Sequence, residues 1–104
     1  MNNELRQRVG DLLIDFGISP SYTGFNFIID SVEIFAENPN IKGQDIYEIL
    51  AIRYKCTSSY VHKSIINAFS KLSEHHKISY FGNIKYSNMG YISTMAWQER
   101  LRTG

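Results

Sequence analysis

The chain has 104 residues, of which 43% are hydrophobic and 20% charged, and its net charge is +1. We expect one all-α domain over residues 1–104, and the nearly neutral total does not indicate a strongly polyanionic partner. The single cysteine, Cys56, excludes an intrachain disulfide and a cysteine-based zinc cluster. No stretch approaches the roughly 18 consecutive apolar residues of a membrane span, and the polar N-terminus has no apolar signal core, so we expect a soluble cytoplasmic protein.

The charges are distributed unevenly along the chain. Residues 1–40 carry six acidic and two basic side chains, net −4, whereas residues 41–104 carry nine basic and four acidic ones, net +5. A domain with one basic side suits a nucleic-acid partner. An uneven distribution of this size also arises by chance in a nearly neutral protein. Charge alone therefore does not decide whether the partner is a nucleic acid.

Two helices are predicted in the acidic part. The first runs from Glu4 to Phe16, with Gly17 placed for a left-handed stop. Its apolar stripe consists of Leu5, Val9, Leu12, Leu13 and Phe16. A second helix is expected to begin after Gly17, with Ser19 as its N-cap and Pro20 at its first helical position. Gly24 is expected to separate a short first turn from the main part of this helix. The second helix covers residues 21–37, and its stripe consists of Phe25, Ile28, Ile29, Val32 and Phe35. Residues 38–40, Asn-Pro-Asn, form a clear break.

The stretch from Gln44 to Leu72 is predicted to form a helix-turn-helix. Its first helix covers residues 45–55, and its core candidates are Ile46, Ile49, Leu50 and Tyr54. The turn lies at residues 55–56, and either Thr57 or Ser58 is expected to cap the second helix, which runs to about Ser73.

At 100° per residue the second helix of the motif separates into two faces. The core side holds Val61, Ile65, Ala68, Phe69 and Leu72, and the opposite side is polar and mildly basic. Lys63 can donate to guanine or to a phosphate, and Asn67 can pair with adenine. Arg53 and Lys77 are additional candidates for backbone contacts. The predicted DNA-contacting set is Thr57, Ser58, Ser59, Tyr60, His62, Lys63, Ile66, Asn67, Lys55 and Lys71.

This pattern has a second interpretation. Paired antiparallel helices with a tight turn also occur in proteins that never bind DNA. Ile66 lies in the middle of the polar face and makes no hydrogen bond, so it either touches a thymine methyl group or meets another protein.

The last part of the chain is predicted to be a loop followed by a helix. Residues 75–90 are polar and aromatic and contain Gly and Asn, so we expect a loop with at most a short helical turn near Tyr80 and Phe81. Asn88 is expected to cap a terminal helix over residues 90–102. The apolar residues of that helix spread over more than one face, which is typical of a helix that also packs against a partner. The fold class is therefore all-α, with about five to six helices.

Other chemistry is weakly indicated. His62, His75 and His76 lack metal-ligand spacing, and Cys56 at a turn favours a small core residue. The acidic pairs Asp11/Asp15 and Glu33/Glu37 are interpreted as solvated helix faces. We expect no catalytic site, cofactor, metal, membrane or small-molecule substrate.

Nearly the whole chain, about residues 10–102, resembles the C-terminal effector domain of the sporulation response regulator, the stage zero sporulation protein A family. The resemblance rests on LLIDFGISPSYTGFNFIIDSVEIF, on IYEILAIRYKCTSSYVHKSIINAF, and on YFGN and NMGYISTMAWQERLR. It implies a six-helix domain that binds double-stranded DNA through the second motif helix, usually as tandem copies. It also implies dimer contacts from the terminal helix, for which the candidates are Tyr91, Met95, Trp97 and Leu101.

The chain departs from the family pattern on the polar face. Lys63 replaces an arginine, His62 stands where the family has an acidic residue, and Ile66 stands where it has a base-reading arginine. A chain of 104 residues has no room for the receiver domain of the family. We therefore expect a stand-alone effector domain that is not controlled by phosphorylation in cis. The expected function is a DNA-binding transcription regulator. The alternative is a protein-interaction module that pairs with a full-length regulator and antagonises it.

Overall fold

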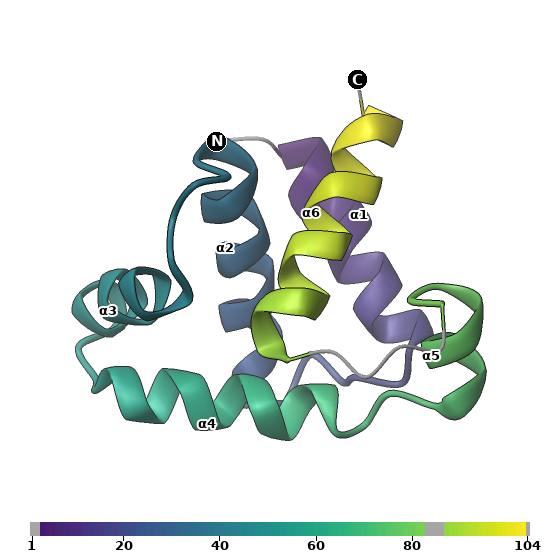
Figure 1. Cartoon of the computed structure of the whole chain (residues 1–104). Helices are drawn as coiled ribbons and strands as arrows, with labels where there is room; N and C mark the ends of the chain where they lie inside the picture. Colours follow the sequence, from purple (N-terminus) through teal and green to yellow (C-terminus); the bar gives the residue numbers. More distant parts are fainter. Residues whose placement is uncertain (1–2, 83–86, 104) are drawn as a thin grey trace.

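The computed structural model describes residues 3–82 and 87–103, the last three by their backbone alone. The described residues form six helices and no strand, which confirms the predicted all-α class (Figure 1). The helices are α1 (Asn3–Asp15), α2 (Thr23–Glu37), α3 (Gly43–Tyr54), α4 (Ser58–Phe69), α5 (Glu74–Ser79) and α6 (Asn88–Thr103). No described helix combines the length and apolar character that a membrane crossing requires.

Helix α2 is the central element of the fold. It packs against α1, α3, α4 and α6, and ten of its 15 residues are buried. A helix that is covered on several sides needs more than one apolar stripe, and α2 buries Phe27 in addition to the predicted Ile28 and Val32. The core around it includes one fully buried side chain from each large helix, namely Leu13, Ile28, Leu50, Ile65 and Ile92.

The start of α2 differs from the prediction. Gly17 has the expected positive φ, +92°, but Ser19 does not cap a helix. Its hydroxyl instead accepts a hydrogen bond at 3.1 Å from the N–H of Ser21, a local turn that competes with helix formation. The helix begins only at Thr23, so Gly24 lies inside its first turn and does not separate two segments. Gly24 is required for another reason, because a Cβ there would lie 2.3 Å from the carbonyl oxygen of Ser64 in α4.

The segment predicted as a loop contains the short helix α5. Ser73 caps it by accepting a hydrogen bond at 3.2 Å from the N–H of His76. The helix before it, α4, ends at Phe69 and not near Ser73. Asn88 was expected to cap the terminal helix, but it is the first helical residue, and the hydroxyl of Ser87 accepts from the N–H of Gly90 at 3.3 Å.

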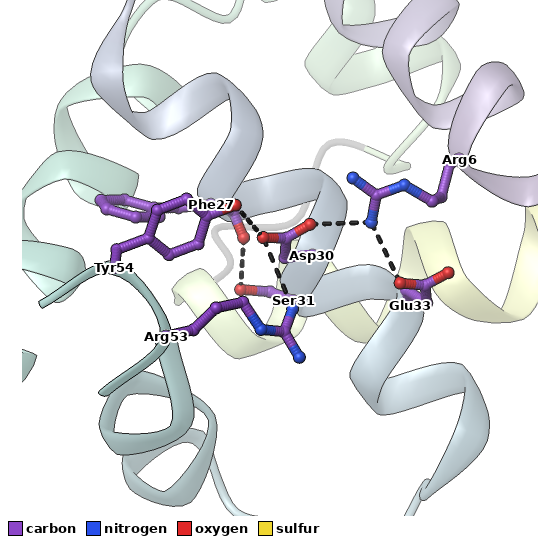
Figure 2. A network of polar contacts seen from close by, with 7 residues as sticks. All are labelled: Arg6, Phe27, Asp30, Ser31, Glu33, Arg53 and Tyr54. Carbon is purple, nitrogen blue, oxygen red and sulfur yellow. Dashed lines mark hydrogen bonds and ion pairs between the residues drawn. The ribbon is translucent and has the colours of Figure 1, made fainter. Parts of the chain in front are cut away.

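A buried carboxylate joins three helices at one point (Figure 2). Asp30 of α2 is 2% exposed and accepts a hydrogen bond at 2.7 Å from Arg6 Nη1 of α1 and another from the Tyr54 hydroxyl of α3. Arg6 also donates to Glu33 Oε1 at 3.0 Å, so the expectation that Glu33 is solvated was wrong. Burial and the hydrogen bond to Asp30 raise the pKa of the Tyr54 phenol above its ordinary value, which favours the protonated phenol that donates to Asp30.

Candidate nucleic-acid interface

Helices α3 and α4 are joined by three residues in a defined turn. Lys55 ends α3 in the left-handed conformation, with φ of 56°, and its N–H bonds to carbonyl oxygens of the last turn. The N–H of Cys56 bonds to the carbonyl oxygen of Ala51 at 2.9 Å. Thr57, one of the two predicted caps, then accepts a hydrogen bond at 3.1 Å from the N–H of Tyr60 and begins α4. The direction of α4 relative to α3 is thus set by backbone bonds on both sides of the turn.

The core side of α3 is partly different from the prediction. Ile46 and Leu50 are fully buried as expected, but Ile49 is 38% and Tyr54 43% exposed. Tyr47, which was not predicted, is 7% exposed and stacks its ring on His62 of α4, with centroids 4.9 Å apart. The single-stripe interpretation missed Tyr47 because α3 packs against both α2 and α4, so its buried face is wider than one stripe.

The predicted separation of α4 into two faces is confirmed by burial. Its core side chains, together with Leu72 beyond its end, are at most 5% exposed. We call the opposite side the outer face of α4. It consists of exposed residues, namely Ser59, Tyr60, His62, Lys63, Ile66, Asn67 and Ser70.

The side chains of the outer face are not equally free. Tyr60 packs edge-on against Phe27, with ring centroids 6.2 Å apart, and His62 stacks on Tyr47. The side chains of Lys63 and Asn67 make no ion pair or hydrogen bond to any described residue. They are therefore available to an external partner without breaking an internal contact.

The basic residues predicted to contact the DNA backbone also fall into two groups, those with an internal carboxylate partner and those without one. Arg53 lies 3.6 Å from Asp30 Oδ2, and Lys77 lies 3.3 Å from Glu74 Oε1. Lys55 and Lys71 are exposed and form no ion pair within residues 3–82 and 87–100, although Lys71 Nζ lies 5.8 Å from the centroid of the Tyr22 ring. Because α4 itself contains no acidic residue, the outer face and its surroundings carry uncompensated positive charge.

The family model described as "Sporulation initiation factor Spo0A C terminal" matches residues 9–96 of the chain. The chain belongs to this family. Comparison with curated proteins and with solved structures gave no significant match. The matched range includes all of α2, α3, α4 and α5, so the recognised part of the chain contains the complete α3–α4 pair. The sporulation initiation factor family is a helical DNA-binding effector domain and not an enzyme class.

The candidate dimer residues of the family's terminal helix lie at very different depths in α6. Met95 is fully buried in the chain's own core, and its role as a dimer contact stays a prediction. Tyr91 is half-buried between the rings of Phe69 and Phe81. Trp97 is 68% exposed. The side chain of Leu101 lies outside the described residues.

Proposed function

We propose that the chain is a DNA-binding transcription regulator that places α4 in the major groove. The observation that carries this proposal is the outer face of α4, which is exposed over its whole length, free of acidic residues and equipped with two uncommitted polar side chains, Lys63 and Asn67. An α-helix with its side chains is about 10–12 Å in diameter and the major groove is about 12 Å wide, so one helix fills it.

The residues of the outer face have distinct roles in this proposal. Lys63 donates to a guanine edge or a phosphate, and Asn67 pairs with adenine. Ser59 and the N–H groups that open α4 bind a phosphate, as helix N-termini do. Ile66, which is 45% exposed, contacts a thymine methyl group. His62 and Tyr60 are held by aromatic neighbours and shape the edges of the face.

A salt titration tests this function. The binding constant for a short AT-rich duplex and for a random one is measured between low and physiological salt, for the wild type and for Lys63→Ala. Direct binding falls steeply with salt, with a logarithmic slope of about −0.9 per phosphate contact. Lys63→Ala is expected to weaken binding by about 1–3 kcal/mol if it reads a base, or to reduce the slope by about one contact if it binds phosphate.

The matched control is Arg102→Ala, which removes the same charge. The N-terminal residue of α6, Asn88, bonds to the carbonyl oxygen of His62 in α4 at 3.4 Å. Arg102, 14 residues further along α6, is therefore about 20 Å away from that contact, given a rise of about 1.5 Å per residue. It should leave the affinity nearly unchanged. No complex of the wild type at low salt would contradict the DNA-binding proposal.

A second candidate function is a protein-interaction module that pairs with a full-length regulator through α6. The exposed Trp97 and the apolar Ile66 on the outer face favour it. Here the expected result is a complex between the chain and a full-length regulator of the family in sedimentation experiments, which Trp97→Ala abolishes. Since the Trp97 side chain is mostly exposed, the substitution should change the free energy of unfolding by less than about 0.5 kcal/mol. A wild-type chain that sediments apart from the regulator, or a complex that Trp97→Ala leaves unchanged, would contradict pairing through this residue.

A further inference from the structure

A cleft of about 370 Å³ lies between the start of α2 and one flank of α4. Figure 1 shows this end of α2 meeting the middle of α4. Residues 21–24 form one wall, and Tyr60, Asn67 and Lys71 contribute to the other. None of the lining residues is acidic. Because Tyr60 and Asn67 also belong to the outer face of α4, a ligand lying along that face reaches the cleft.

The α2 wall of the cleft is the start of a long helix. Helix α2 has 15 residues, and its N-cap residue, Tyr22, has extended backbone angles and supplies no side-chain hydrogen bond to the first turn. The N–H groups of a first helical turn have no partners within the helix, and the helix dipole adds partial positive charge there. This end of α2 therefore favours an anion.

Two side chains of the other wall point to the same ligand. Ser64 is 9% exposed and lines the cleft, and its hydroxyl has no hydrogen-bonding partner among the described residues. Among the described residues no fully buried side-chain nitrogen or oxygen lacks a partner, so this hydroxyl still reaches the solvent of the cleft, where it can donate to a ligand. Lys71 Nζ, 5.8 Å from the centroid of the Tyr22 ring, adds a positive charge that no described carboxylate neutralises.

We propose that this cleft binds a phosphate of the DNA backbone at the edge of the major groove. The N–H groups of Thr23 and Gly24 and the hydroxyl of Ser64 donate to the phosphate oxygens, and Lys71 supplies charge. The inference rests on the proposed placement of α4: a helix that fills the groove has one backbone on each flank, and the cleft lies on the α2 flank. The start of α2 thus becomes part of the interface and fixes the rotation of α4 in the groove.

Thr23→Asp tests the proposal without weakening the fold. Thr23 is exposed and is the first residue of α2, where a carboxylate interacts favourably with the helix dipole and with the free N–H groups. The same carboxylate occupies the N–H groups and repels a phosphate. We expect roughly tenfold weaker binding to a short duplex at low salt and a salt slope reduced by about 0.9, the equivalent of one phosphate contact.

Asn40→Asp is the matched control, because it makes the same charge change at an exposed position beyond the other end of α2. It should leave both the affinity and the slope unchanged. Ser64→Ala, which removes the hydroxyl and little volume, should weaken binding roughly threefold or more while the melting temperature stays the same. In the wild type, titration with the duplex should shift the amide resonances of Thr23 and Gly24.

The outcomes separate this inference from the function on which it rests. A wild type that binds the duplex, with Thr23→Asp binding equally well, would overturn the phosphate site and leave the placement of α4 standing. A wild type that does not bind the duplex at low salt would overturn both. Weaker binding by Thr23→Asp but not by Asn40→Asp, with both variants folded, would support the site.

Discussion

Replacing Gly24 by alanine is expected to destabilise the protein by about 3 kcal/mol, although alanine is intrinsically the better helix former by about 1 kcal/mol. The added Cβ would lie 2.3 Å from the carbonyl oxygen of Ser64 and 2.8 Å from Ala68 Cβ. Both atoms belong to α4, one to its backbone and the other a Cβ atom fixed to it, so neither can move without shifting the helix. The start of α2 and the part of α4 around Ser64 and Ala68 would have to move apart. Urea denaturation monitored by circular dichroism measures the change.

A Gly→Ala substitution in α1 should change the stability in the opposite direction. At Gly10 the nearest atoms to an added Cβ are Ile29 Cδ1 at 3.6 Å and Phe25 Cζ at 3.9 Å, which are ordinary contacts. Gly10→Ala is therefore expected to stabilise the protein by about 0.5–1 kcal/mol through helix propensity alone. Adding Ala68→Gly to Gly24→Ala removes only the contact at 2.8 Å and itself costs about 1 kcal/mol of helix propensity, so it should not restore the wild-type stability. Equal effects of the two Gly→Ala changes would contradict the close approach at Gly24.

Periodicity in the sequence predicted the parts of the fold that depend on one helix at a time. The stripes of α1 and α4 are regular, so stepping 100° per residue separated the core side of α4 from its outer face correctly. Helix α5 has six residues and none of them is buried, so it has no stripe to detect. Only Ser73, a cap placed directly before Glu74, marked its start.

Contacts between helices could not be predicted in the same way. Asp30 and Glu33 were indistinguishable from solvated acids in the sequence, because their partner Arg6 lies 24 and 27 residues away. The closeness of Gly24 to Ser64 is likewise a property of how two helices cross. For the candidate site this means that the outer face was predictable from α4 alone, whereas the cleft beside it, built from α2 and α4, was not.

Asp30→Ala is the second substitution with a large expected effect, about 3 kcal/mol of destabilisation. The carboxylate is 2% exposed, and it bonds to Arg6 Nη1 at 2.7 Å, accepts from the Tyr54 hydroxyl and lies 3.6 Å from Arg53 Nη1. Its removal leaves these donors without their shared acceptor and leaves a gap between α1, α2 and α3. For a domain of this size the melting temperature should fall by more than about 10 °C.

Substitution of Asp30 should also change DNA binding at the candidate interface, because it alters the charge balance around Arg53. In the wild type Asp30 neutralises Arg53 beside the start of the α3–α4 turn, whereas Lys55, two residues later, has no described carboxylate partner. In Asp30→Asn, which keeps the shape of the side chain, Arg53 loses that neutralising charge. We therefore expect lower stability but a steeper salt dependence of DNA binding, by up to about one phosphate contact.

Glu37→Ala is the control for both measurements, because it removes an equal charge from the exposed last residue of the same helix. An acid at a helix C-terminus is unfavourable to the dipole, so its loss should be neutral or slightly stabilising. If Asp30→Ala and Glu37→Ala had the same melting temperature, the buried network would contribute nothing to holding α3 in place. If Asp30→Asn left the salt slope of DNA binding unchanged, Arg53 would serve the fold alone, and the positive charge beside the turn would come from Lys55.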